Sequence, residues 1–179
     1  MKKLNILALT GVLALTASSA NAISLVGSAF SFGGHDYTLI SSDNWTNSEA
    51  FAVTQGGHLV AVNDINENNF IINTFGLQNS LWIGLYRTAP HASTWAWTNG
   101  DAVTFANWAG GEPNDAGTGE EYVHTYVSGL WNDLDDNNSY SGPKYGVLET
   151  VSTKVPEPSS VLMLLGGLLA MFGIRRQSK

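Results

Sequence analysis

The first half of the chain carries two helix patterns separated by a short apolar run. Asp43–Gln55 predicts a first helix, because polar capping residues stand at its start and a Gly-Gly pair follows its end. Asp64–Glu67 has the spacing of a capping box and predicts a second short helix that ends near Gly76. Leu59–Val62, between the two, is continuously apolar and predicts a buried strand, and Tyr37–Leu39 has β-type composition.

Strand patterns replace helix patterns in the second half. Leu81–Leu85 is an apolar run typical of a buried strand, Trp95 and Trp97 share one face of a short alternating segment, and Tyr122–Val127 alternates again. The Gly-rich acidic stretch Gly110–Gly119 predicts a loop. Helices early and short strands late indicate a mixed α+β domain.

The N-terminal residues have the pattern of an export signal. Lys2 and Lys3 precede the apolar run Leu4–Leu15, and the small-residue triplet Ala20-Asn21-Ala22 follows. These parts predict a secretory signal peptide that is cleaved after Ala22. A membrane anchor is the weaker alternative, because polar residues interrupt the segment and its apolar part is short for a bilayer.

The C-terminal residues form a second tripartite segment. Pro156-Glu157-Pro158 precedes the apolar run Val161–Ile174, and Arg175-Arg176 follows, so we expect the tail to stay cytoplasmic while the central domain lies outside. The arrangement resembles the PEP-CTERM sorting signal of Gram-negative bacteria. The resemblance implies transient inner-membrane anchoring, processing by a membrane sorting peptidase, and delivery to the cell surface or the exopolysaccharide matrix. The alternative is an ordinary C-terminal anchor.

Charge and cysteine content argue against several function classes. The chain has 15 Asp+Glu against 8 Lys+Arg, and this balance argues against nucleic-acid binding through phosphate contacts. Between Ile23 and Val155 the only Lys and Arg residues are Arg87, Lys144 and Lys154. Because the chain has no cysteine, disulfides, thiol nucleophiles, zinc-thiolate sites and iron–sulfur clusters are excluded.

Carboxylates are concentrated in one stretch that contains no Lys or Arg. Like charges so close together repel one another unless a cation lies among them, and Ca²⁺ accepts carboxylate and amide oxygens alike. Zinc and copper fit poorly, because cysteine is absent and the four histidines lack close ligand spacing. The carboxylates of this stretch are those of Glu112, Asp115, Glu120, Glu121, Asp133, Asp135 and Asp136.

Six short motifs follow one another along the central segment. They are Gly56-Gly57-His58-Leu59, Trp82-Ile83-Gly84-Leu85, Trp97-Thr98-Asn99-Gly100-Asp101, Phe105-Ala106-Asn107-Trp108, Glu112-Pro113-Asn114 and Trp131-Asn132-Asp133. In this order they resemble the C-type lectin-like domain, with a match from about Tyr37 to Glu149. The resemblance implies an α+β fold of two helices and two small antiparallel sheets, with a long loop that binds calcium and sugar.

These patterns divide the chain into five parts. They are a signal peptide (1–22), an N-terminal lead-in (23–36), a C-type lectin-like domain (37–150), a linker (151–155) and a sorting or anchor segment (156–179). The chain departs from the family in its disulfides, whose positions by resemblance fall near Ala52 with Leu148 and near Tyr122 with Asp136. Since losing such a bridge costs about 2–5 kcal/mol, the core must compensate.

The resemblance also assigns a site. It implies that calcium is bound by Glu112, Asn114, Glu120, Asn132 and Asp133, and that the first four also bind the sugar. Two sugar hydroxyls would complete the calcium shell, accepting hydrogen bonds from Asn amides and donating to Glu carboxylates. Glu-Pro-Asn implies vicinal equatorial hydroxyls of the mannose, glucose, N-acetylglucosamine or fucose type. A turn that aligns these oxygens predicts a cis Glu112–Pro113 peptide.

Several other residues can be interpreted either as functional or as structural. Asp115 and Glu121 match part of an auxiliary calcium site of the family, but Tyr86–Thr94 supplies no acid for its remaining ligands, so they are alternatively two solvated carboxylates. We expect His124 to be structural. Four tryptophans could stack on sugars, but their motifs favour core packing: Trp82, Trp97, Trp108 and Trp131.

Three function classes remain open. The first is a non-enzymatic, calcium-dependent lectin that binds a carbohydrate, with an exopolysaccharide as a possible partner. The second is a surface adhesion, matrix or ice-interacting module with the same fold and either structural calcium or none. The third is a glycoside hydrolase with Glu120 or Glu121 as acid, which is disfavoured because the sequence sets neither carboxylate apart and a bound cation keeps both ionised.

Overall fold

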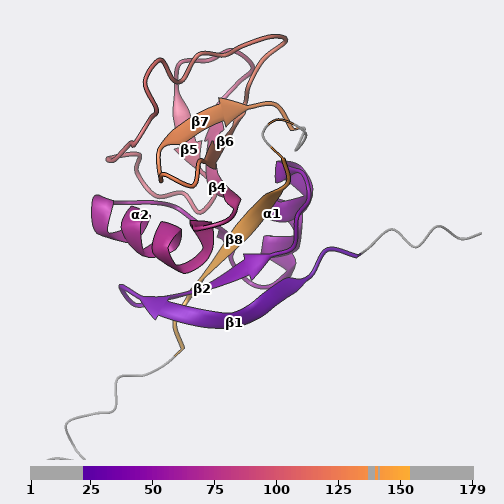
Figure 1. Ribbon diagram of the computed structural model, residues 1–179, viewed down its shortest axis with the longest axis vertical. Coiled ribbons are helices and arrows are strands. Elements are labelled where there is room, and N and C mark those ends of the chain that lie inside the picture. Colours follow the sequence, from indigo (N-terminus) through magenta and orange to yellow (C-terminus); the bar gives the residue numbers. More distant parts are fainter. Residues whose placement is uncertain (1–21, 137–139, 141, 154–179) are drawn as a thin grey trace, which may run out of the picture.

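The computed structural model describes residues 22–136, 140 and 142–153, which form one mixed sheet flanked by helices (Figure 1). The sheet has the strand order β1-β2-β8-β4-β6-β7, with β3 paired to β8 and β5 paired to β4. Its strands are β1 Leu25–Phe32, β2 His35–Ile40, β3 His58–Leu59, β4 Ser80–Arg87, β5 Trp95–Trp97, β6 Tyr122–Thr125, β7 Trp131–Leu134 and β8 Lys144–Val151. The helices are α1 Trp45–Thr54, α2 Ile65–Ile71 and the π-helix η1 Ile72–Gly76.

The two expected antiparallel sheets are present but joined. β2 and β3 pair antiparallel with β8, and β5 and β6 pair antiparallel with β4. Between these groups, β4 and β8 run parallel over the pairs Ser80↔Lys144, Leu81↔Tyr145 and Trp82↔Gly146. So short a pairing between distant segments leaves no periodic signal in the sequence. The α+β class is confirmed, and the sheet is continuous.

The expected lead-in is part of the domain. β1 forms an antiparallel hairpin with β2 through the turn Gly33-Gly34, where both glycines have positive φ (60° and 92°). Seven of the eight β1 residues are exposed. Because a strand is recognised in a sequence by alternation between a buried apolar face and an exposed polar face, β1 gives no such signal. The sheet therefore begins before Tyr37, with β1 at Leu25.

Both predicted helices are confirmed, and local capping explains their starts. Asn44 caps α1, with its side chain accepting a hydrogen bond from Asn47 N, so the helix begins after the expected Asp43. Asp64 caps α2 by accepting from the backbone N–H groups of Asn66 and Glu67. The segment from Ile72 to Gly76 continues as a π-helix.

The apolar run after α1 is buried but only partly a strand. His58 and Leu59 pair with β8, whereas Val60–Val62 have no strand assignment although all three are buried. Val60 N donates to Val147 O and Gly84 N donates to Val60 O, so the segment is wedged between β8 and β4. The predicted strand is therefore shorter than Leu59–Val62.

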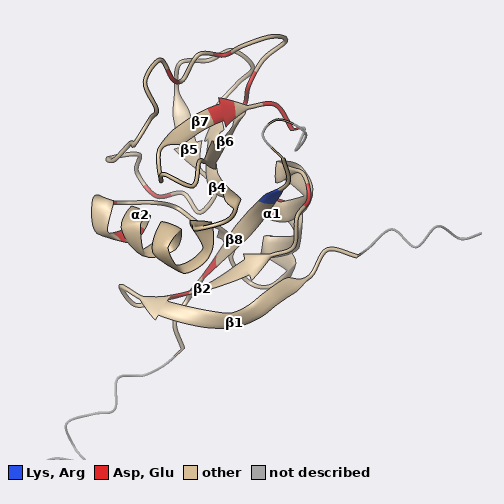
Figure 2. Cartoon of the chain, in the orientation of Figure 1, with Lys and Arg blue, Asp and Glu red and all other residues tan. Residues whose placement is uncertain are grey.

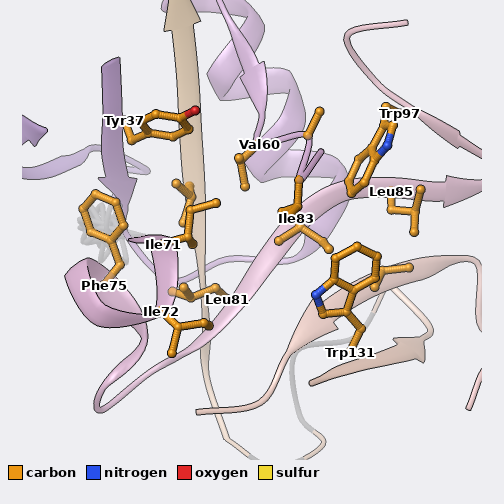
Figure 3. Close-up of a cluster of buried hydrophobic side chains, with 14 residues drawn as sticks. Tyr37, Val60, Ile71, Ile72, Phe75, Leu81, Ile83, Leu85, Trp97 and Trp131 are labelled. Atoms are coloured by element: carbon orange, nitrogen blue, oxygen red, sulfur yellow. The ribbon is translucent and has the colours of Figure 1, made fainter. Parts of the chain in front are cut away.

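Part of the hydrophobic core is an aromatic cluster around Trp131, and Figure 3 shows Trp131 and Trp97 of this cluster beside the aliphatic side chains of the core. Trp131 is fully buried, and its ring meets those of Trp97, Phe105 and Trp108 edge-on at centroid distances of 5.9, 5.6 and 5.8 Å. Its Nε1 donates to Asn68 Oδ1 at 2.9 Å. The core-packing prediction is confirmed for these tryptophans and for the fully buried Trp82, although Trp108 is only partly buried.

Packing and capping replace the two family disulfides. Ala52 and Leu148 are both buried in one apolar cluster. At the second position the Tyr122 ring stacks on Trp45 at 4.4 Å, and Asp136 accepts a hydrogen bond from the Thr46 backbone N–H at the start of α1. Each pair of positions therefore still links distant parts of the fold, without a covalent bond.

The predicted end segments lie almost wholly outside the described residues, as does part of the predicted linker. The signal-peptide interpretation covers 1–22 and the sorting segment 156–179, whereas the described chain runs from 22 to 153 with gaps at 137–139 and 141. Within that described part, no helix has both the length and the apolar character needed to span a membrane.

Candidate functional site

A long irregular loop, residues 98–121, joins β5 to β6 and is fastened to β7. A parallel bridge pairs Trp108 with Trp131, where Ala109 N donates to Trp131 O and Trp131 N donates to Asn107 O, both at 2.8 Å. Farther along the loop, the Glu112–Pro113 peptide is cis, as the sequence predicted. Figure 2 shows Asp and Glu residues along the loop and on β7, so acidic groups converge at this end of the domain.

Asp133 on β7 is the centre to which the loop is fastened. Its side chain is fully buried. Oδ1 accepts a hydrogen bond from Asn114 N at 3.0 Å, and Oδ2 accepts from Asp115 N at 3.0 Å. Oδ2 also contacts Nη2 of Arg87 at 2.5 Å. The Glu-Pro-Asn and Trp-Asn-Asp motifs, distant in sequence, are therefore adjacent in the fold.

Two glutamates complete a group of three acids. Burial raises the pKa of Glu112, and the neighbouring Asp133 raises it further. Burial also raises the pKa of Glu120, with further contributions from Asp133, Glu112 and Asp135, although a hydrogen bond from Ala116 N opposes the shift. The structure thus brings the three expected carboxylates close enough to interact.

The side chain of Glu112 has an unsatisfied atom. Its Oε2 is shielded from solvent and has no hydrogen-bond partner among the described residues. A buried carboxylate oxygen without a donor is costly. A cation placed between Glu112 and its acidic neighbours removes both this cost and the repulsion.

The two asparagines of the predicted site have different environments. Asn114 is exposed. Asn132 is buried, and its Nδ2 contacts His124 Nε2 at 3.2 Å and the Asp133 carbonyl at 2.5 Å. Burial lowers the pKa of His124 to about 4, so the ring is neutral and its Nε2 accepts from the amide while Nδ1 donates to Thr125 O. As expected, His124 is structural, and it orients Asn132.

The two candidate auxiliary residues face other partners. Asp115 Oδ2 lies 2.8 Å from His91 Nδ1, and Asp115 Oδ1 lies 3.7 Å from Arg87 Nε. Glu121 is partly buried, and its backbone carbonyl accepts a hydrogen bond from Arg87 N. Asp115 is therefore not a freely solvated carboxylate. A basic side chain stands beside Asp115.

Comparison with known families decides the identity of the fold. A model of the lectin C-type domain matches residues 41–141, and a model of the PEP-CTERM protein-sorting motif matches residues 154–177. The chain belongs to the C-type lectin domain family. It also carries a PEP-CTERM sorting motif, so both predicted resemblances are confirmed.

Individual relatives agree with this assignment. Mouse C-type lectin domain family 4 member G is 34% identical over 102 residues, which cover 55% of this chain and 34% of that protein. The chain therefore spans about a third of that relative. The cow CD23 carbohydrate-recognition domain, solved in the presence of a GlcNAc2Man3 oligosaccharide, is 25% identical with a TM-score of 0.63, covering 74% of this chain and 99% of that one.

A third comparison concerns the fold alone. A calcium-independent type II antifreeze protein is 22% identical with a TM-score of 0.61. The match covers 72% of this chain and 96% of the antifreeze protein chain. One fold thus includes a domain crystallised with an oligosaccharide and a protein described as calcium-independent. The choice between these functions for this C-type lectin domain depends on its own site residues.

Arg87 is the site residue that the sequence analysis missed. The segment Tyr86–Thr94 contains no acid, and its important residue is basic. Arg87 directly follows the apolar core of β4, is only 7% exposed and, with Lys144, is one of the two Lys and Arg residues in the described chain. A lone arginine next to a buried strand, in a domain rich in acids, was the available signal.

The donor set of this C-type lectin domain fits calcium better than other metals. Among the described residues, no three Asp, Glu, His or Cys side chains are grouped so that they could together hold a metal ion. The candidate set instead combines three carboxylates with two amides, all of them oxygen donors of the kind that Ca²⁺ accepts. This set includes Glu112 Oε2, a buried oxygen without a hydrogen-bond donor, which a bound cation would satisfy.

A cavity opens beside the candidate site. Its volume is about 340 Å³, and it is lined by Glu120, by the loop Ala116–Gly119, and by Leu134, Asp135 and Tyr140. Carboxylates, backbone and an exposed tyrosine ring are the surfaces that bind sugars by hydrogen bonds and ring contact. The candidate calcium ligand Glu120 thus borders a space suited to a sugar.

Proposed function

We propose that this C-type lectin domain binds carbohydrate through a calcium ion, without catalysis. The calcium ligands are Glu112, Asn114, Glu120, Asn132 and Asp133. The observation that carries the proposal is Glu112 Oε2, a solvent-shielded acceptor without a partner in the described chain, in a side chain whose pKa is raised by burial and by the neighbouring Asp133. A hard cation satisfies that oxygen and offsets the repulsion, and its remaining coordination positions suit sugar hydroxyls.

The environments of the ligands divide their roles. The ionised carboxylate of Asp133 has about four acceptor positions, and three are used by Asn114 N, Asp115 N and Arg87, so one on Oδ1 remains for the cation. Asn132 is assigned chiefly to calcium. Its amide nitrogen already contacts His124 Nε2 and the Asp133 carbonyl, so it would have to give up one of these hydrogen bonds to contact the sugar. Exposed Asn114, with Glu112 and Glu120, is the main sugar contact.

The proposed sugars and location follow from the two family resemblances. Glu-Pro-Asn favours vicinal equatorial hydroxyls of the mannose, glucose, N-acetylglucosamine or fucose type. The sorting motif at 154–177 supports export, transient anchoring in the inner membrane of a Gram-negative bacterium, processing by a sorting peptidase, and delivery to the surface or matrix. An exopolysaccharide is the natural partner there, because its repeated sugars compensate for weak single contacts.

The carboxylate pKa values require one correction but do not make the domain a hydrolase. The sequence sets no carboxylate apart from the others, whereas in the structure burial raises the pKa of both Glu112 and Glu120. A calcium ion between them keeps both ionised, and the relatives are lectins. The raised pKa values therefore mark a cation site better than a catalytic acid.

Replacing Asn114 by Asp tests the separation of the two roles. The variant keeps an oxygen ligand but loses an amide donor, so calcium binding should persist while sugar binding weakens by about 1.5–3 kcal/mol, or roughly 10- to 150-fold. Calorimetric titrations with calcium and then with methyl mannoside measure both. Asn66→Asp, which adds the same charge at the exposed start of α2, is the matched control. Equal sugar affinity in Asn114→Asp and wild type contradicts the assignment.

Calcium affinity should fall in mild acid. The calcium-free folded state has raised pKa values at Glu112 and Glu120, so these groups take up protons above their usual pKa of 4.5 as the pH falls. Protons then compete with calcium, and affinity declines between neutrality and pH 4.5. The same shifts mean that, without calcium, these two groups increase stability as the pH falls through this window. Calcium titrations at several pH values check the first trend, and denaturant unfolding in chelator checks the second.

A second candidate function rests on the Arg87–Asp133 ion pair. This buried contact of 2.5 Å satisfies much of Asp133 without a metal. The ion pair therefore supports a calcium-free surface adhesion, matrix or ice-interacting module, and the sequence alone contains no such support. In that case the wild type binds its partner equally with and without chelator.

A further inference from the structure

Arg87 occupies the interior of the loop region as an ordered positive charge. Its Nε donates to Glu120 O at 2.8 Å, and its Nη1 donates to Ala92 O at 2.5 Å. Its Nη2 pairs with Asp133, and its Cζ lies 4.4 Å from the centroid of the Trp95 ring. The guanidinium therefore connects β4, the β4–β5 connection, the long loop and β7.

The surroundings of this guanidinium are those of a cation site. Two backbone carbonyls and the carboxylates of Asp133 and Asp115 face it. Carbonyl and carboxylate oxygens are the ligands that Ca²⁺ uses in loops. Asp115 is also a residue that the family resemblance assigns to an auxiliary calcium site. In this chain the guanidinium already supplies the positive charge that these oxygens accept, so it stands in the place of a second divalent cation.

Lys144, the other Lys or Arg residue in the described chain, cannot serve this purpose. Lys144 is fully buried, and its Nζ donates to the carbonyls of Tyr140 and Gly142 beneath the Trp82 ring. Of the Lys and Arg residues in the described chain, Arg87 is thus the one that contacts the acids Asp115 and Asp133.

We propose that the Arg87 guanidinium replaces the auxiliary calcium ion of this domain. It fastens the long loop to β7 and orients Asp133, so that the loop keeps its conformation without calcium and the chain binds one calcium ion. The single calcium rests on the proposed function, whereas the fastening of the loop does not. Arg87 is a positioning residue, since it acts on the sugar site through Asp133.

Geometry explains why arginine is needed for this role. The planar guanidinium reaches two carbonyls and a carboxylate with separate N–H groups while its face packs on Trp95. A lysine ammonium is a compact point charge on a flexible stem and cannot make these contacts together. Arg87→Lys therefore keeps the charge but loses the fastening.

Hydrogen exchange in the full chain tests the loop directly. The amides of Asn114 and Asp115 both donate to Asp133, so they report whether the loop is held. In the wild type we expect them to be protected to a similar degree in calcium and in chelator. Protection that appears only after calcium is added overturns the proposal.

The Arg87→Lys variant and a calcium count complete the test. In chelator, the protection factors of both amides should be at least about tenfold lower in Arg87→Lys than in the wild type. The calcium affinity of the variant should fall about 10–100-fold, as when other residues that hydrogen-bond to a metal ligand are replaced. Thr94→Val, an exposed change in the same connection, should alter neither. Two calcium ions per wild-type chain, or unchanged exchange in Arg87→Lys, overturn the proposal. If no calcium binds at all, the proposed function fails, while protection in chelator still supports the role of Arg87.

Discussion

Replacing Trp131 by alanine is expected to lower the free energy of unfolding by about 3–5 kcal/mol, the range for truncating a large buried aromatic side chain. The side chain is fully buried and meets three other aromatic rings edge-on, so its loss leaves a cavity that the rigid neighbours cannot fill. It also leaves Asn68 Oδ1 without the indole donor. Because a domain of this size has only about 5–15 kcal/mol of stability, the variant should be close to unfolding.

Chemical denaturation followed by far-UV circular dichroism measures this loss. Trp131→Phe keeps an aromatic ring but removes the donor to Asn68, and should cost less than the alanine change. Leu77→Ala, at a side chain that is 69% exposed, should shift the stability by no more than about 0.5 kcal/mol. A loss below about 1 kcal/mol in Trp131→Ala would show that this aromatic cluster is not the structural core beneath the loop.

Replacing Asp133 by alanine is expected to abolish calcium and sugar binding together and to destabilise the domain by about 3–5 kcal/mol. The side chain is the acceptor for Arg87, Asn114 N and Asp115 N, so truncation leaves a buried guanidinium and two loop amides without their partner. An uncompensated buried charge has a cost of this size. The same residue is thus required for the fold of the loop and for the proposed metal.

A double variant separates these two effects. Arg87→Met combined with Asp133→Ala removes both charges, so it should recover part of the stability that Asp133→Ala loses. It should not recover calcium or sugar binding, because the carboxylate is still missing. Denaturant unfolding and calcium calorimetry on the single and double variants give both quantities. Mannose binding retained by Asp133→Ala would contradict the proposed site.

The parts of the fold that were predictable are those determined by local sequence. The capping residue Asp64 stands next to the backbone groups that it satisfies, so α2 could be predicted from a few residues. The cis peptide before Pro113 was predictable from the turn that aligns the oxygens of Glu112 and Asn114, a ligand set implied by the family resemblance. The meeting of Glu112 with Asp133 is not local, and its prediction came from the family resemblance of their two motifs.

The features that were missed depend on contacts between distant segments. β1 is mostly exposed and has no hydrophobic pattern, and the β4–β8 pairing is too short to leave one. The role of Arg87 depends on carbonyls of Ala92 and Glu120, and carbonyls have no sequence signature. Such a site becomes visible only when the backbone of the loop is placed in space.

Retention of the protein on a mannose resin, in calcium and then in chelator, tests calcium-dependent sugar binding. We expect retention in millimolar calcium, in line with the roughly 10⁻⁴–10⁻³ M affinity of extracellular calcium modules, and release when a chelator is added. Glu112→Gln removes a charged ligand at the unpaired oxygen and should pass through the resin in both conditions. Retention of the wild type in excess chelator, or its passage through the resin in calcium, would contradict calcium-dependent sugar binding.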